Sequence, residues 1–119
     1  MIIDRESIER AFEQTVWFGF RELKPGCVQI RTPFTYPDGD VIDVFVIDTQ
    51  DLLRVTDMGE TLRHLGSCEA RQHISGLQLL HRCVRLGKGE LYQDVATPEE
   101  VPEAAIELVE CIERLCSLV

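Results

Sequence analysis

The sequence predicts a single-domain α+β protein in which an antiparallel meander of three to four strands is packed on one face by about four helices. Apolar residues recur every three or four positions near both ends of the chain, which predicts helical N- and C-terminal segments. From Cys27 to Asp57 they recur every second position instead, and strong turn signals divide this stretch. Because 119 residues is the commonest size of one domain, we expect a single core over residues 1–119.

The first expected helix starts after Asp4, whose side chain can cap a backbone N–H group of the first turn. Its apolar positions follow at spacings of three and four: Ile8, Ala11, Phe12 and Val16. The end of the helix stays open, because Phe20 continues the helical stripe whereas the aromatic run 17–20 suits a short strand.

Three strands are expected in the meander, from Cys27 to Thr35, from Val41 to Asp48 and from Leu52 to Asp57. Residues 36–40 form the first turn, in which proline presets φ and glycine accepts a positive φ. Residues 48–51 form the second turn, which is short enough for a tight hairpin.

The remaining elements are mostly helical. Helices are expected from about Met58 to Leu65 and from about Arg71 to Leu86, with a short edge strand from Glu90 to Val95. The last helix begins near Pro98 or Pro102. It carries one apolar stripe: Val101, Ala105, Leu108, Ile112, Leu115 and Val119. This stripe is either a core face or the seam of a homodimer.

Centring the two turns aligns the strands of the meander. The first turn, centred on Asp38, places Thr32 opposite Val44, and the second places Val46 opposite Leu53. One face of the sheet is then apolar and must be covered by helices: Val28, Ile30, Phe34, Ile42, Val44, Val46, Leu53 and Val55.

The other face of the predicted sheet brings an aromatic residue between two arginines. Phe45 lies opposite both Arg31 and Arg54 in this alignment, and Asp43 lies diagonal to Arg54. One interpretation is a binding surface built on Arg31, Phe45 and Arg54. The alternative is a partly covered face on which Asp43 simply pairs with an arginine.

The composition of the chain indicates which partners and which cellular compartment to expect. A net charge of −9 opposes direct binding to DNA or RNA, and no apolar run reaches the length of a membrane helix. The first residues lack the features of a secretory signal, so we expect a cytoplasmic protein. Five cysteines without a C-x-x-C pair indicate reduced, mostly buried thiols.

The acidic residues gather in two parts of the chain. Residues 36–60 carry seven acids against Arg54 alone, and residues 98–119 carry six glutamates against Arg114 alone. This pattern predicts a non-catalytic interaction protein that meets a basic surface of a partner, with Glu103, Glu107 and Glu110 in the contact. An inhibitor of a nucleic-acid-binding complex, of the anti-defence or anti-CRISPR kind, is one special case. The alternative is an ordinary solvated helix face.

A metal-dependent enzyme acting on nucleic acid or phosphate esters is the alternative function. Asp40, Asp57 and Glu60 are its candidate catalytic residues, because the meander brings them to the same end of the sheet. The spacing of Asp57 and Glu60 also fits a capping box at the start of a helix. Histidines and cysteines show no zinc-ligand spacing, so neither a metal nor a cofactor is expected.

Three segments carry a resemblance to a known family: Ile30 to Phe34, Asp38 to Ile42 and Val55 to Leu62. Together they resemble the uncharacterised family of bacterial and phage proteins called domain of unknown function DUF1828. The resemblance implies a prokaryotic or phage origin and supplies no activity. It also implies a second acid at the position where this chain has Met58.

Overall fold

A computed structural model describes residues 3–12, 17–66, 73 and 85–118 of the chain. Its elements are α1 (Arg5–Ala11), β1 (Gly19–Lys24), β2 (Cys27–Thr35), β3 (Val41–Asp48), β4 (Leu53–Thr56), α2 (Glu60–Leu65), β5 (Arg85–Gly87), β6 (Glu90–Val95), the 3-10 turn η1 (Pro98–Glu100) and α4 (Val101–Leu118). All strands belong to one antiparallel sheet in the order β1-β2-β3-β4-β6-β5.

The α+β class is confirmed, but the predicted numbers of strands and helices are wrong. The sheet has six strands instead of three to four, and the described residues form three α-helices instead of about four. The additional strands are the edge strands β1, which contains part of the ambiguous aromatic run, and β5, which takes the end of the expected 71–86 helix. The rest of that expected helix lies outside the described residues apart from His73.

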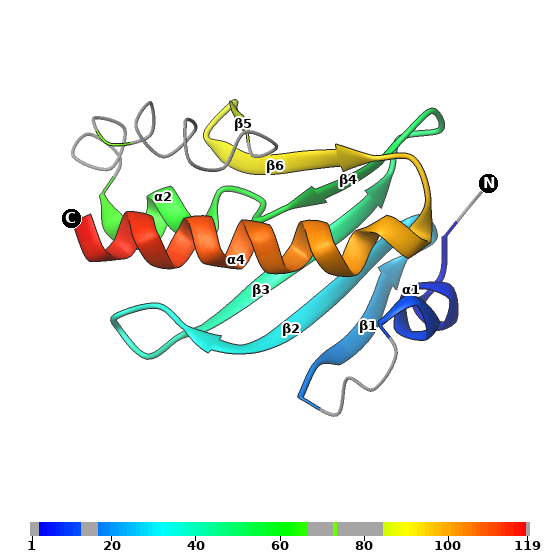
Figure 1. Cartoon of the computed structure of the whole chain (residues 1–119), viewed down its shortest axis with the longest axis horizontal. Coiled ribbons are helices and arrows are strands. Elements are labelled where there is room, and N and C mark those ends of the chain that lie inside the picture. Colours follow the sequence, from blue (N-terminus) through cyan, green and yellow to red (C-terminus); the bar gives the residue numbers. More distant parts are fainter. Residues whose placement is uncertain (1–2, 13–16, 67–72, 74–84, 119) are drawn as a thin grey trace.

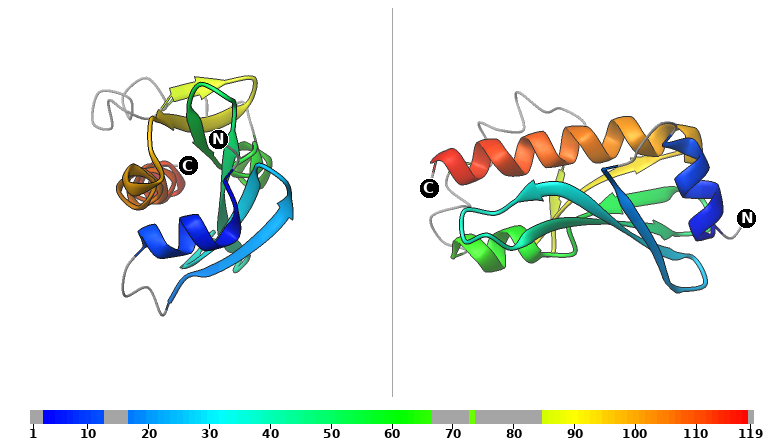
Figure 2. Two further views of the ribbon diagram at one scale, coloured as in Figure 1. Left: turned by 90° about the vertical axis from the view of Figure 1, so that its right-hand side faces the viewer. Right: turned by 90° about the horizontal axis from the view of Figure 1, so that it is seen from below.

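Helix α4 crosses one face of the sheet along its length (Figure 1), and α1 lies on the same side (Figure 2). The inward-facing residues of the apolar stripe of α4, from Val101 to Leu115, are buried in the core of the chain. Of the two interpretations left open for this stripe, the core face is therefore correct. None of the helices in the described part of the chain is long and apolar enough to span a membrane.

Helix α1 packs beside η1 and β1 on the same face of the sheet as α4. Asp4 caps it by accepting a hydrogen bond from the Ser7 backbone N–H at 2.8 Å, as the sequence predicts. Phe12, at the end of α1, packs against the rings of Phe18 and Phe20, with centroids 5.3 and 5.1 Å away. The strand β1 therefore reaches the core through Phe20 although most of its other residues are exposed.

The predicted register of the meander is wrong by two residues. Val44 lies opposite Ile30, and Val46 lies opposite Val55. The predicted alignment holds next to the first turn, but the register shifts between Arg31 and Thr35. At the second turn, β4 begins only at Leu53, so the loop is longer than a tight hairpin.

An even shift returns each side chain to the same face, so the predicted inner face is largely correct. Seven of its eight residues are buried: Val28, Ile30, Ile42, Val44, Val46, Leu53 and Val55. Phe34 is the exception: it lies within the irregular segment between Arg31 and Thr35 and is 39% exposed.

Three of the five cysteines lie in described segments and are free thiols. Cys27 and Cys111 are buried, and burial raises the pKa of Cys111 to about 11. These thiols match the expectation of reduced, mostly buried cysteines. Cys68 and Cys83 lie outside the described residues.

The buried carboxylate of Asp57 joins three segments of the chain. It accepts backbone hydrogen bonds from Gly59 at 2.8 Å and Thr61 at 3.3 Å, at the start of α2, and from Leu91 of β6 at 3.0 Å. Burial raises the pKa of Asp57, while these hydrogen bonds act in the opposite direction. The predicted capping box is half correct, because Asp57 caps α2 but Glu60 pairs with Arg63 instead of reaching back.

Replacing Asp57 with alanine should strongly destabilise the fold. The variant leaves the buried N–H groups of Thr61 and Leu91 without their acceptor, at about 1–3 kcal/mol for each donor. We expect urea denaturation to show a loss of at least about 2 kcal/mol in the free energy of unfolding. Asp51→Ala, at an exposed turn position, is the control and should change it by less than about 0.5 kcal/mol. Equal stability of the two variants would contradict the structural role of Asp57.

Candidate functional site

A hollow of about 520 Å³ lies on the sheet face opposite α4. Strands β2 and β3, the turn between them and helix α2 surround it. Its lining combines charged and aromatic side chains with the turn: Arg31, Tyr36, Gly39, Asp40, Val41, Asp43, Phe45, Glu60 and His64. This combination makes the hollow the candidate site.

The backbone before α2 sets the direction in which this helix leaves the sheet. Met58 and Gly59 both have positive φ, at 54° and 81°, so the chain turns sharply after β4. A Cβ atom at residue 59 would lie 3.4 Å from the Gly89 carbonyl oxygen, which accounts for glycine there. Helix α2 then buries Thr61 and Leu62 and places Glu60 and His64 over the hollow.

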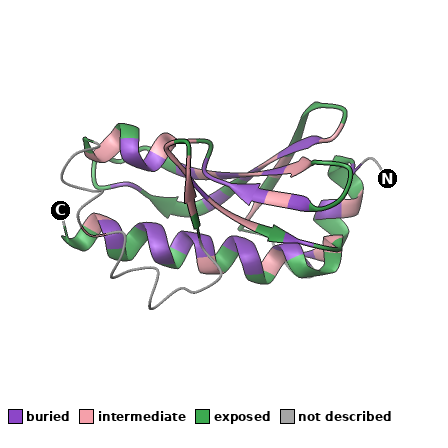
Figure 3. Ribbon diagram, turned by 90° about the horizontal axis from the view of Figure 1, so that it is seen from above, coloured by how far each residue is buried: buried purple, intermediate pink, exposed green. Residues whose placement is uncertain are grey.

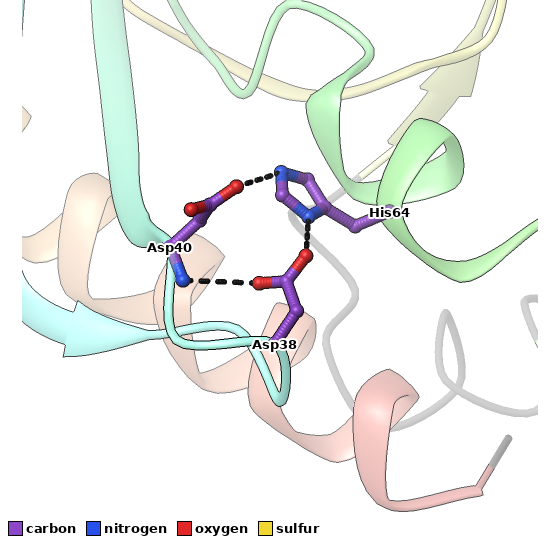
Figure 4. Close-up of side chains that lie close together, drawn as sticks. All are labelled: Asp38, Asp40 and His64. Atoms are coloured by element: carbon purple, nitrogen blue, oxygen red, sulfur yellow. Dashed lines mark hydrogen bonds and ion pairs between the residues drawn. The ribbon is translucent and has the colours of Figure 1, made fainter.

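His64 is the centre of the site (Figure 4). Its Nδ1 atom lies 2.6 Å from an oxygen of Asp38 in the β2–β3 turn. On the other side of the ring, Nε2 lies 3.8 Å from a carboxylate oxygen of Asp40 and 3.8 Å from one of Glu60. Three carboxylates from the turn and from α2 therefore surround one imidazole.

Tyr36 holds the imidazole from one side. The two rings are stacked with centroids 4.0 Å apart and an angle of 11° between their planes. The buried Tyr36 hydroxyl lies 3.1 Å from the hydroxyl of Thr61, which ties the β2–β3 turn to α2. Burial raises the pKa of Tyr36, so this hydroxyl stays protonated at neutral pH. The site is thus preformed by packing.

The turn holds its own carboxylates in place. Asp38 accepts a hydrogen bond from the Asp40 backbone N–H at 3.0 Å. This bond, and then the contact with His64, lower the pKa of Asp38, so its carboxylate is ionised at neutral pH.

The three predicted catalytic acids do not all meet. Asp40 and Glu60 approach the same imidazole nitrogen, but both carboxylate oxygens of Asp57 accept backbone hydrogen bonds in the core. His64 and Asp38 take part instead, although neither was a predicted site residue. They are separated by 26 positions, and no sequence spacing indicates that contact.

The predicted arrangement of an aromatic ring between two arginines is wrong. Phe45 lies opposite Gln29 and Thr56, because of the two-residue shift in register. Asp43 instead accepts hydrogen bonds from Gln29 at 2.9 Å and from Arg31 at 3.3 Å, as the simpler interpretation expects.

Arg54 is engaged at the other end of this face. It forms two hydrogen bonds with Asp94 on β6, at 2.9 and 3.1 Å, and its guanidinium lies 3.9 Å from the centre of the Tyr92 ring. Bidentate pairing and stacking account for its position without a ligand. Only Arg31 and Phe45 of the three predicted residues line the hollow.

A second acidic surface lies on α4, away from the sheet. Figure 3 shows exposed and buried residues alternating along this helix. Glu103, Glu110 and Glu113 are exposed and Glu107 is half-buried, and none of them has a salt bridge within the described part of the chain. We call these four residues the α4 glutamate row.

One group of side chains could hold a metal ion. Ligand atoms of Asp38, Asp40 and His64 all lie within 4.8 Å of one another, and it is the only such group among the residues that the structure describes. Carboxylate and imidazole ligands suit zinc and also manganese. A metal on Nδ1 would have to replace the contact of His64 with Asp38.

Comparison with known proteins identifies one family. The family model described as domain of unknown function DUF1828 matches residues 32–115, from β2 almost to the end of α4. Searches of curated proteins and of solved structures gave no match.

The backbone at Met58 has a conformation that favours aspartate or asparagine. This residue has a φ of 54°, and its N–H group donates a hydrogen bond to the Thr56 hydroxyl at 3.0 Å. Aspartate and asparagine adopt positive φ more readily than other residues with a side chain. An acid here therefore satisfies the backbone and needs no catalytic pair with Asp57.

Met58→Asn should stabilise the protein. The methionine side chain is 42% exposed, so little packing is lost, and asparagine tolerates the positive φ. We expect the free energy of unfolding to rise by about 0.5–1 kcal/mol in urea denaturation. Met58→Val is the matched variant, and it should lower that free energy because a β-branched residue opposes positive φ. A loss of stability in Met58→Asn would contradict this explanation.

Proposed function

The chain belongs to the DUF1828 family, whose description names no function, and we propose that it is a non-catalytic acidic interaction protein that binds a basic surface of a protein partner. The observation that carries this proposal is the α4 glutamate row, which is directed away from the core and lacks salt bridges among the described residues.

Repulsion within the α4 glutamate row supports a partner of opposite charge. Glu103 and Glu107 are four positions apart, and Glu107 and Glu110 are three apart. Like charges at these spacings cost about 0.2–0.5 kcal/mol per pair, and this chain does not offset them with lysines on the same face. A basic surface would relieve that repulsion on binding.

The class of partner follows from charge. At a net charge of −9 the chain would be repelled by DNA or RNA, whereas proteins that bind nucleic acids carry basic surfaces of the required kind. We therefore propose that the chain is an inhibitor that occupies such a surface, in the cytoplasm of the prokaryotic or phage-infected cell that the family resemblance implies. A homodimer through α4 would bring two glutamate rows together, which like-charge repulsion disfavours.

Charge reversal on α4 tests the proposal. Glu103→Lys combined with Glu110→Lys should abolish capture of nucleic-acid-binding proteins from a nuclease-treated bacterial extract by the immobilised chain. The double variant should stay within about 1 kcal/mol of the parent in the free energy of unfolding, because attractive pairs with Glu107 offset the new repulsion at Arg114 and the loss of an acid in the first turn of α4. Lost capture therefore reports the surface and not unfolding.

The control reverses two exposed acids elsewhere. Glu9→Lys with Asp51→Lys changes the net charge by the same amount and leaves α4 intact. The control should keep the captured proteins. If both double variants capture the same proteins as the parent, the α4 glutamate row serves solvation only and the proposal fails.

Metal-dependent hydrolysis of nucleic acid or phosphate esters is the second candidate function. It is favoured by one observation, the convergence of Asp38, Asp40 and His64 beside the hollow, with Glu60 next to them. Such ligands can activate a metal-bound water for attack on a phosphate ester.

Titration with a metal tests this second candidate. At about ten times its Kd, manganese or zinc should raise Tm by about 5 °C, because it binds only the folded chain. Asp40→Asn should remove the shift, and Asp51→Asn, the matched control at an exposed turn, should keep it. If millimolar magnesium, manganese and zinc each produce neither heat in calorimetry nor a change in Tm, this function is excluded.

A further inference from the structure

We propose that the hollow on the outer sheet face is a binding site for the guanidinium group of an arginine side chain that a protein partner presents. The strand residues that line the hollow alternate with those buried against α4, so the hollow lies on the opposite side of the sheet from α4. This site is therefore separate from the α4 glutamate row, and neither surface requires the other.

The balance of charge in the hollow favours a cation. Its lining includes Asp40, Asp43 and Glu60, against Arg31 as the only lysine or arginine. Arg31 and Asp43 form a salt bridge at 3.3 Å, so Arg31 does not oppose an incoming cation by a full charge. Glu60 is paired in the same way with Arg63 at 2.8 Å, so Asp40 is the carboxylate of the lining that has no lysine or arginine partner among the described residues.

Asp40 is the carboxylate best placed to receive that cation. Its side chain is 72% exposed and has no salt bridge to a lysine or arginine among the described residues. An oxygen of Asp40 and an oxygen of Glu60 each lie 3.8 Å from the same nitrogen of His64. Asp40 therefore lies at the same edge of the His64 ring as Glu60, a carboxylate from another element.

The shape of the lining favours arginine over lysine. A guanidinium group is planar, carries five N–H donors and can bond two carboxylates at once, whereas an ammonium group is a point charge. Phe45, which is half-buried in the lining, supplies aromatic surface against which a planar cation can pack.

The hollow also has the size and rigidity of a binding site. Its volume of about 520 Å³ is within the range of small-ligand pockets, which is about 300–1,000 Å³. The contact between Tyr36 and Thr61 and the stacking on His64 join its walls before any ligand arrives. In a preformed site, little of the binding free energy is lost in ordering side chains and loops when the ligand binds.

N-acetyl-L-arginine amide is a suitable probe, because it carries the side-chain charge without charged ends. Titrated into the full chain, it should cause saturable NMR shifts that concentrate on residues 39–45 and 60–64. Asp40→Asn should weaken its binding by about tenfold, because a charge-assisted hydrogen bond is lost. Glu110→Gln, on α4, should leave the affinity unchanged.

Three outcomes would overturn the proposal. The first is the absence of saturable shifts, and the second is shifts spread over α4 as well, which indicate general attraction of cations. The third is equal binding of N-acetyl-L-glutamine amide, which has no charge. Because the probe reports on the hollow alone, these outcomes do not affect the proposal for α4. Failed capture through α4, in turn, does not affect the proposal of an arginine site in the hollow.

Discussion

The candidate site depends on one buried carboxylate. Asp57 follows β4 directly and accepts hydrogen bonds from Gly59 and Thr61 at the start of α2 and from Leu91 of β6, so it fixes where α2 starts and which way the helix runs. A helix anchored there places His64 beside the β2–β3 turn, where Asp38 and Tyr36 meet the ring. The most buried acid of the meander region is therefore structural, and it positions the acids that face solvent.

The core explains why acidic surfaces remain on both sides of the molecule. Helix α4 uses its apolar stripe to cover the inner sheet face, which leaves its glutamates directed outwards. The outer face is shared by strand side chains and by the end of α2, and there the hollow forms. Exposed acids of this chain, which has a net charge of −9, therefore lie on two surfaces: the α4 glutamate row and the hollow on the outer sheet face.

The sequence predicted the inner face well and the neighbours across strands poorly, for a single reason. Alternation depends only on the chain's own period of two, and a shift by two residues leaves it unchanged. Neighbours depend on register, which here changes at an irregularity between Arg31 and Thr35, where Pro33 cannot donate a hydrogen bond to the next strand. Phe45 was therefore placed on the correct face but beside the wrong residues.

The position of an acid relative to the turns predicted whether it lies in the candidate site, whereas its charge alone did not. Asp40 and Glu60 were expected at one end of the sheet and do meet at His64, because the hairpin brings the two ends together. Asp57 carries the same charge in the same region, yet the backbone occupies it fully. These acids differ in how many backbone N–H groups near them need an acceptor. The carboxylate oxygens of an acid just before a buried helix are occupied by the N–H groups of the first turn. An acid at the tip of a turn keeps an oxygen for a ligand.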